Sequence, residues 1–213
     1  MKYSLLVSFL FASLLIFSAC SDSPVNSSDA ELISEEFTSL AEKRAPAPGD
    51  QTIAGIVSDA AGAEDDAQFT LLLAALEYAE LTDVFAGEDQ YTVFAPTDAA
   101  FLALVGLLSA NEDWDSDLGP FEAIDDLLGE DTVKNVLFYH VTEGRRAANS
   151  VVPRNSRAAD RTISTLLEGA SFHVAYDLTI TDIAGQDASI VNADLSASNG
   201  IIHVIDTVLL PLN

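Results

Sequence analysis

The apolar pattern of the chain changes once, from a helical spacing to a strand spacing, and this change limits the folds available to it. Residues 69–81 (FTLLLAALEYAEL), the segment after Asp98 and residues 131–141 carry apolar side chains at helical spacing. After about residue 160, apolar residues alternate with polar ones, as in 201–205, which is typical of strands. Helices followed by strands, with little alternation between the two, predict an α+β domain.

The segment YTVFAPTDAAF, residues 91–101, changes from strand-forming to helix-forming residues around Pro96. Proline does not continue the interior of a strand, and Thr97 or Asp98 can cap the N-terminus of the helix that follows. No histidine or cysteine lies nearby in the sequence to form a catalytic set with Asp98. We therefore interpret this corner as structural rather than catalytic.

The charge of the chain excludes one class of partner. The 213 residues include 34 acidic and nine basic residues, which give a formal net charge of −25. Such a surface repels the phosphate backbone, so we expect no nucleic-acid binding. Nearly half of the residues are apolar, which is enough for a packed core and argues against a disordered chain.

The N-terminal segment has the features of a lipoprotein signal. Residues 1–19 combine Lys2 with a long apolar run, which is short for a membrane-spanning helix and fits a secretory signal peptide. The run ends at Cys20, the only cysteine, and the local sequence FSAC resembles a bacterial lipobox. We expect a lipid on Cys20 to anchor the protein to the cell envelope, at the outer membrane or cell surface. Residues 20–50 are then a tether, and residues 51–213 the folded domain.

Three stretches carry a family resemblance. The segment TVFAPTDAAF, the pair Tyr139-His140 and the segment ADLSASNGIIHVIDTVLLP resemble the signature regions of the fasciclin (FAS1) domain, in the same order. The resemblance covers about residues 51–211. It implies a single domain in which a helical layer packs on a β-wedge of two small sheets, and a function in binding rather than catalysis. Residues 106–131 depart from the family pattern because they are longer and more acidic.

The resemblance also suggests interaction residues. In animal fasciclin domains the Tyr-His pair is implicated in adhesion, which transfers to Tyr139 and His140 by resemblance alone. An Asp-Ile pair implicated in integrin binding corresponds here to Asp194 and Leu195, which we carry over only as a contact surface. The residues themselves also allow structural roles. His140 lies on an apolar helical stripe, as a core histidine would, and Asp194 is a turn-forming residue.

A cluster of arginines invites two interpretations. Five of the six arginines lie within seventeen residues: Arg145, Arg146, Arg154, Arg157 and Arg161. They could form a recognition patch for acidic glycans or for partners that carry carboxylates, because guanidinium groups bind such groups with two hydrogen bonds. Alternatively, they could pair with the protein's own acids, for example those of the 112–131 region, and this internal pairing is the interpretation we favour from sequence.

The acidic insertion contains a candidate calcium site. Asp113, Asp115 and Asp117 alternate as the ligands of a calcium loop do, and Ca²⁺ prefers oxygen ligands. However, Gly119 stands one place late for an EF-hand, and the twelfth position is Ile124 rather than glutamate. The alternative is a solvated acidic loop. Apart from calcium we expect no cofactor, since no zinc-type spacing, phosphate-binding glycine loop or G-x-S-x-G motif occurs.

Together these features predict a cell-envelope lipoprotein that acts as an adhesion or surface-interaction module through one domain. Its partners would be the membrane, through the lipid, and a matrix protein, a glycan or another cell-surface molecule. The alternative is a binder or carrier of a small apolar ligand, held in a groove between helices and sheet. We do not expect an enzyme.

Overall fold

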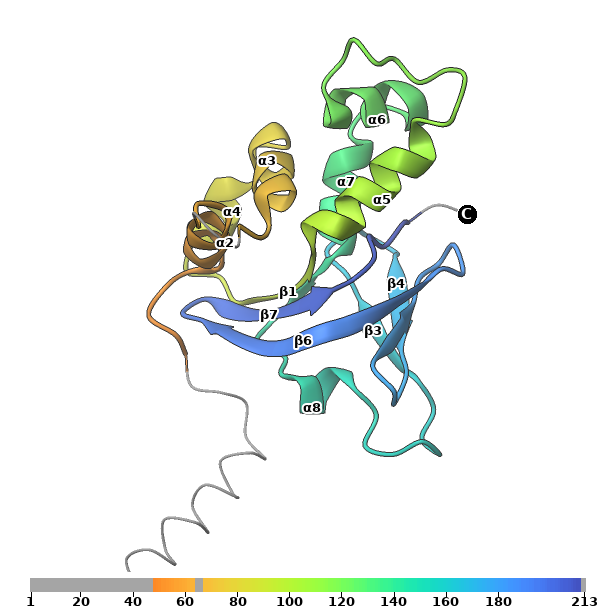
Figure 1. Cartoon of the computed structure of the whole chain (residues 1–213). Helices are drawn as coiled ribbons and strands as arrows, with labels where there is room; N and C mark the ends of the chain where they lie inside the picture. Colours follow the sequence, from red (N-terminus) through yellow and green to blue (C-terminus); the bar gives the residue numbers. More distant parts are fainter. Residues whose placement is uncertain (1–47, 64–66, 212–213) are drawn as a thin grey trace, which may run out of the picture. The chain divides into compact units, whose positions relative to one another are not determined.

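A computed structural model describes residues 48–63 and 67–211, all of which belong to one unit of the chain, Ala41–Asn213 (Figure 1). The predicted signal peptide, Cys20 and nearly all of the predicted tether lie outside the described residues. Within those residues, no helix has the length and apolar character needed to cross a membrane.

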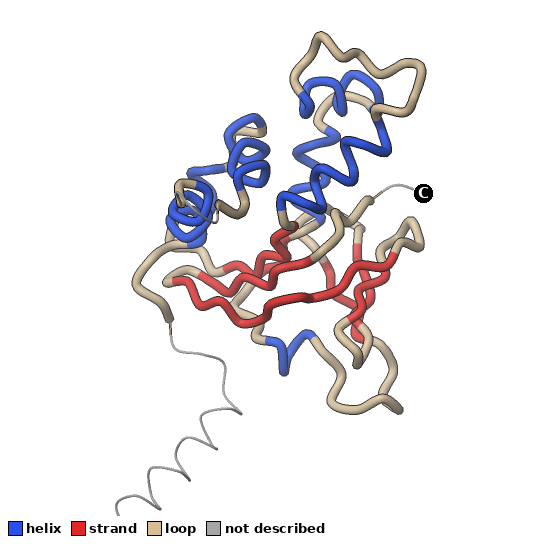
Figure 2. Tube along the Cα trace, in the orientation of Figure 1, coloured by secondary structure: helices blue, strands red, loops and turns tan. Residues whose placement is uncertain are grey.

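The helices come mainly from the first half of the domain's sequence and the strands from the second half. Figure 2 shows the helices in blue and the strands in red. The helices are α2 (Ile53–Ala61), α3 (Thr70–Tyr78), α4 (Thr82–Ala86), α5 (Asp98–Leu108), α6 (Pro120–Leu128), α7 (Thr132–Tyr139) and α8 (Ala148–Val151). The strands are β1 (Tyr91–Pro96), β2 (Val141–Glu143), β3 (Arg161–Ser164), β4 (Ser171–Val174), β5 (Thr179–Thr181), β6 (Asp187–Ala197) and β7 (Gly200–Ile205). The α+β prediction is confirmed.

The strands form one mixed sheet in the order β2-β1-β7-β6-β5-β4-β3. Only β1 and β7 run parallel to each other, and the remaining neighbours are antiparallel. The long strand β6 pairs with β5 near its start and with β7 along the rest, and its pairing register shifts twice on the β7 side. The two small sheets that we expected are thus joined through β6: one part contains β2, β1, β7 and β6, and the other contains β6, β5, β4 and β3.

Two apolar clusters form the core. The first lies between helices α2, α3, α5, α6 and α7 and one face of β1 and β7, and it includes Ile53, Phe101 and Ile202. The second lies between β1, α7 and the β3–β5 strands, where the Phe94 and Phe172 rings meet edge to face with centroids 4.9 Å apart. Strand β7 is buried along its whole length, as expected for a strand covered on both faces. In Figure 1, α2–α7 lie on one side of β6 and β7, and α8 lies on the other.

The corner after β1 has the structural role predicted from sequence, but it acts on two helices. Thr97 caps its own helix α5, because its Oγ1 accepts a hydrogen bond from the Ala100 N–H. The Asp98 carboxylate instead accepts hydrogen bonds from the N–H groups of Thr70 and Leu71, and from the Thr70 hydroxyl, at the N-terminus of α3. Helix α3 begins after Phe69, which has no side chain able to cap it, so Asp98 supplies that cap from 28 residues away.

Part of the acidic insertion is a helix that the sequence analysis did not predict. Residues 106–131 contain the end of α5, a loop and α6, which starts with proline at its first position. Phe121 and Ile124 face the core, and the Phe121 ring meets the Phe101 ring edge to face. Glu122 and Asp126 are exposed, whereas Asp125 accepts a hydrogen bond from the Val133 N–H. These three acids interrupt the short apolar face of α6 in the sequence.

The turn between β6 and β7 ties the helices to the sheet. The buried Asn199 side chain accepts a hydrogen bond from the Ile53 N–H at 2.8 Å and donates to the carbonyls of Phe85 and Gly87. Gly200 follows, and a Cβ atom there would lie 2.1 Å from the Tyr91 carbonyl oxygen, so only glycine fits beside β1. The predicted Asn-Gly turn is confirmed, and it also holds the ends of α2 and α4.

Replacing Asp98 by alanine tests the cap on α3. Asp98→Ala removes three hydrogen bonds at a helix N-terminus, and we expect the free energy of unfolding to fall by about 1–2 kcal/mol. Chemical denaturation of the purified protein measures this change. Asp126→Ala, which removes an exposed acid from α6, is the control and should change stability by less than about 0.5 kcal/mol. Equal effects of the two substitutions would contradict the capping role.

Candidate functional site

Tyr139 and His140 are buried at the end of α7, where they join three parts of the domain. The Tyr139 hydroxyl donates to the Ser171 carbonyl of β4 and accepts from the Ile183 N–H, each at 3.0 Å. His140 Nδ1 donates to the Val136 carbonyl at 2.7 Å, and its Nε2 accepts from the Leu209 N–H at 2.9 Å. Both side chains are less than 5% exposed, so they are not part of a contact surface in this structure. Their role in adhesion stays a prediction of the resemblance.

Burial sets the protonation of this pair. It lowers the pKa of His140 to about 4 and raises the pKa of the Tyr139 hydroxyl, because the charged form of each group loses hydration. His140 is therefore a neutral imidazole at neutral pH. Protonation at Nε2 would remove the acceptor for the Leu209 N–H, and thereby weaken the attachment of the C-terminal segment.

Arg145 holds the β6–β7 hairpin. Its guanidinium group lies across the end of the hairpin, where it donates to the carbonyls of Ala197 and Gly200 and contacts the Ser196 hydroxyl. Partial burial lowers the pKa of this guanidinium. The group nevertheless keeps its positive charge at neutral pH. Arg145 therefore has a structural position, in contact with the same hairpin turn that carries Asn199.

Asp194 lies close to Arg146, although the two are 48 positions apart in the sequence. The Asp194 N–H donates to His203 Nδ1 at 3.2 Å, and His203 Nε2 donates to the Arg146 carbonyl at 3.0 Å. Burial lowers the pKa of His203, which favours the neutral form that accepts at Nδ1. Asp194 has a φ of 64° and lies where the β6 register shifts, while Leu195 packs partly buried against the core.

The carboxylate of Asp194 fixes α8 on the sheet. Its Oδ1 accepts a hydrogen bond from the Ala148 N–H, the first residue of α8, at 2.8 Å. At the other end of α8, the Arg161 guanidinium of β3 donates to the Ser150 carbonyl at 2.9 Å. The sequence analysis gave Asp194 a turn or contact role and missed this cap, because the two partners are 46 positions apart.

Residues 152–160 (VPRNSRAAD) form the loop between α8 and β3, which we call the arginine loop. Asn155 shapes it, since its side chain accepts from the Arg157 N–H and its carbonyl accepts from the Ala158 N–H, both at 3.1 Å. Arg154 and Arg157 are exposed on this loop. In the part of the chain that the structure describes, neither guanidinium group pairs with a carboxylate.

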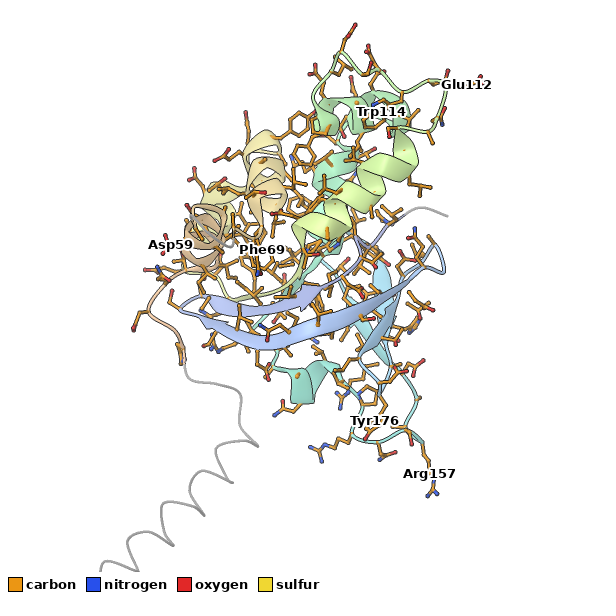
Figure 3. The ribbon with its side chains drawn as sticks, in the orientation of Figure 1. Asp59, Phe69, Glu112, Trp114, Arg157 and Tyr176 are labelled. Atoms are coloured by element: carbon orange, nitrogen blue, oxygen red, sulfur yellow. The ribbon has the colours of Figure 1, made fainter. Side chains whose placement is uncertain are left out.

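The preferred sequence interpretation, that the arginines pair with acids of the 112–131 region, is wrong for this loop. Figure 3 shows Arg157 at the opposite end of the view from Glu112 and Trp114. The other three arginines of the cluster, Arg145, Arg146 and Arg161, each donate a hydrogen bond to a backbone carbonyl. Arg154 and Arg157 thus have no carboxylate partner among residues 48–63 and 67–211.

The charge of the folded part divides sharply along the sequence. Residues 48–133, which form β1 and helices α2 to α6, contain 20 acidic residues and no basic residue. Residues 134–211 contain eight acidic and six basic residues, including both exposed arginines of the arginine loop. Counting acidic and basic residues separately in the two halves of the domain's sequence would have revealed this division without a structure. The loop thus belongs to the part of the sequence in which acidic and basic residues nearly balance.

The three aspartates of the candidate calcium loop do not form a metal site in this structure. Two side chains of this loop are used in turns, since Asn111 accepts from the Asp113 N–H and Asp115 accepts from the Asp117 N–H. Within residues 48–63 and 67–211, no three His, Cys, Asp or Glu side chains are grouped so that they could hold a metal ion. Calcium binding stays a prediction of the sequence, without support from this geometry.

An apolar cavity lies between α3, α5, α6 and α7. It has a volume of about 70 Å³, and its walls include Phe101, Phe121, Ile124 and Leu137. Sites for small ligands usually measure about 300–1,000 Å³, so this cavity does not admit such a ligand without movement of its walls.

Asp194 variants test whether this residue holds the arginine loop. In Asp194→Ala the Ala148 N–H loses its acceptor and alanine must adopt a positive φ, so we expect α8 and the loop to open more often. Trypsin cleavage after Arg154 and Arg157, followed by mass spectrometry, measures this opening, and we expect a rate increase of about fivefold or more. Asp194→Asn keeps the acceptor oxygen and tolerates the backbone angle, so it should cleave like wild type. Unchanged cleavage of Asp194→Ala would contradict the role.

The buried His140 makes stability depend on pH. The unfolded chain binds a proton at this imidazole below about pH 6.5, but the folded chain does not do so until about pH 4. Its contribution to stability is therefore complete above pH 6.5 and is lost as pH falls toward 4, by an amount on the order of 3 kcal/mol. Denaturation of wild type and His140→Gln across this range isolates the effect, since other acids titrate in both. Parallel pH profiles would contradict it.

Comparison with known proteins agrees with the sequence signatures. The family model described as Fasciclin domain matches residues 67–211. Protein sll1483 of Synechocystis sp. is 33% identical over 159 residues, which cover 73% of each chain. The cell surface glycolipoprotein MPB83 of Mycobacterium bovis is 29% identical over 194 residues, which cover 85% of this chain and 73% of that protein.

The fold has a counterpart among solved structures. A FAS1 domain pair from the insect cell adhesion molecule fasciclin I superposes with a TM-score of 0.58 at 16% identity. The match covers 76% of this chain and 51% of that one, so this chain spans about half of the domain pair. The family model matches most of the chain, and a relative is 33% identical over 73% of both chains. The chain therefore belongs to the fasciclin (FAS1) domain family.

Proposed function

We propose that this protein is a surface-interaction module of the cell envelope, with a role in adhesion, and that the arginine loop binds partners that carry carboxylate or sulfate groups. The observation that carries the proposal is the pair Arg154 and Arg157, exposed and without a carboxylate partner among the described residues of a strongly acidic protein. Acidic glycans and acidic segments of matrix or cell-surface proteins have this chemistry.

The loop is suited to such binding because it is held in shape. Asp194 and Arg161 fix α8 before the loop and the start of β3 after it, and Asn155 forms a turn within it. A loop that is already ordered loses less conformational entropy on binding than a free one does. Guanidinium groups also bind carboxylates and sulfates through two parallel hydrogen bonds, which gives a contact that lysine cannot reproduce.

The N-terminal sequence supports the placement in the envelope. The apolar run before Cys20 and the lipobox-like FSAC indicate export and a lipid anchor, with the segment to residue 50 as a tether. The names of two similar proteins agree with a surface role, since one is a cell surface glycolipoprotein and the other a cell adhesion molecule. Outer-membrane attachment and display at the cell surface are part of this proposal.

A second candidate function rests on the apolar cavity between α3, α5, α6 and α7. Its walls are apolar throughout, which suits an apolar ligand rather than a polar one. Its volume of about 70 Å³ admits only a narrow group, such as part of an alkyl chain. Adhesion is therefore the better supported function, and carriage of a small apolar ligand is the alternative.

Binding to acidic polymers tests the proposal. We expect the protein to bind alginate or dextran sulfate immobilised on beads, and Arg154→Gln/Arg157→Gln to bind at least about tenfold more weakly, since two charged contacts are lost. The free energy of unfolding should change by less than about 0.5 kcal/mol, because both side chains are exposed and neither has a partner among the described residues. Surface plasmon resonance and chemical denaturation measure the two effects.

Lys134→Gln is the control, because it removes a positive charge from α7 and should leave binding within about twofold of wild type. Equal binding by wild type and the double arginine variant would contradict the role of the loop, as would no binding to either polymer. Native mass spectrometry of the same preparation shows whether a small apolar molecule is bound at one per chain. Such a molecule, together with no polymer binding, would favour the carrier function.

A further inference from the structure

Helix α5 exposes an apolar face that no described part of the protein covers. Residues 99–111 contain no charged residue, so α5 is apolar on all sides after its first residue, Asp98. Helices of this kind are normally buried. Here Phe101 faces the core, whereas Leu102 and Leu107 are 63% and 68% exposed. In Figure 1, no other element passes in front of α5.

The exposed residues of α5 form one continuous stripe. Ala99, Leu102, Ala103, Gly106 and Leu107 are all exposed, and their spacing of three and four places them on the same side of the helix. Small residues in this stripe leave the backbone accessible between the two leucines, so that another chain can approach closely. We call this surface the α5 stripe.

A groove continues the α5 stripe at the start of the helix. It has a volume of about 530 Å³ and runs between the N-terminus of α5 and strands β6 and β7, with Asp98, Ala99 and Val191 among its walls. Val191 is 57% exposed. The three most exposed large apolar side chains among the described residues are Leu107, Leu102 and Val191. Leu102 and Leu107 lie on the α5 stripe, and Val191 lines the groove that the stripe meets at Ala99.

The surroundings of the stripe are acidic. Asp98 lies at its start, beside the groove, and the loop after α5 carries Glu112, Asp113, Asp115 and Asp117 at its other end. Residues 48–133 contain no basic residue that could offset these charges. A chain that lies on the α5 stripe therefore buries apolar side chains in the middle and meets negative charge at both ends.

We propose that the α5 stripe and the adjoining groove bind an amphipathic helix that has an apolar face and basic flanks. Charge complementarity selects this partner, because lysine or arginine at its ends would meet the acids at both ends of the stripe. A second copy of this chain fits poorly, since the acids at the ends of its own α5 stripe would lie against the acids at the ends of the first stripe. This site lies apart from the arginine loop and takes a partner of opposite charge.

A peptide of defined composition tests this inference. The probe is an 18-residue peptide of leucine and lysine with leucines at helical spacing, and Trp114, the only tryptophan, reports binding by its fluorescence from the loop after α5. We expect saturable binding that weakens as NaCl is raised. We expect Leu102→Gln/Leu107→Gln to weaken binding at least about tenfold with little change in stability, because both side chains are exposed.

Three controls separate this site from general charge attraction and from the proposed function. A peptide of the same composition in scrambled order, and a leucine–glutamate peptide, should bind at least tenfold more weakly than the probe. Tyr176→Gln removes an exposed apolar side chain elsewhere and should bind like wild type. Arg154→Gln/Arg157→Gln should also bind the peptide like wild type, so that failure of the arginine loop and failure of this site give different results.

Several outcomes would overturn the inference. These are equal binding of the scrambled peptide, equal binding by the double leucine variant, or no binding of the probe below millimolar concentration. Sedimentation velocity of the protein without peptide can give a further outcome that would overturn the inference. If wild type forms dimers that Leu102→Gln/Leu107→Gln does not form, then the stripe is an interface between copies and the proposed partner is wrong.

Discussion

A single buried amide at the β6–β7 turn holds this domain together. Asn199 uses both its oxygen and its nitrogen, and it connects the start of α2 with the carbonyls of Phe85 and Gly87 at the end of α4. The backbone carbonyl of Asn199 accepts a hydrogen bond from the Tyr91 N–H, so the start of β1 is attached to the same turn. Because the hydrogen bonds to the Ile53 N–H and the Phe85 carbonyl are buried, these two groups would be left without a partner if the amide moved. The hairpin turn therefore fixes the start of α2, the end of α4 and the start of β1 relative to one another.

The same hairpin positions the candidate interaction surface on the other side of the sheet. Arg145 contacts the carbonyls on either side of the turn, and the register shift of β6 brings Asp194 to α8. Bulges often re-aim a side chain in this way. The residues that the family resemblance pointed to, from Tyr139 to Asp194, thus mostly position other groups. The exposed arginines that follow α8 are the groups that a partner can reach.

Local patterns in the sequence allowed much of the fold to be predicted. The β7 run, the Asn199-Gly200 turn and the α7 stripe are visible in the sequence because each depends on neighbouring residues. The role of Asp98 was only half predicted, since its partners at α3 are 27 and 28 positions away. Helix α6 was missed because its three acids are as numerous as its three buried residues, so the apolar face is short and interrupted in the sequence. Pairing of the arginines was misjudged, since a sequence gives charge but not the distance between charges.

The uneven distribution of acids gives the domain an electric dipole moment in addition to its net charge. With 20 acids and no base in residues 48–133, and a nearly balanced second half, the centre of negative charge is displaced toward the helices. A negatively charged surface, such as a layer of acidic polysaccharide, exerts a torque on such a molecule as well as a repulsion. That torque turns the helical half away and brings the arginine loop forward. The domain would approach such a surface already oriented, before any contact forms.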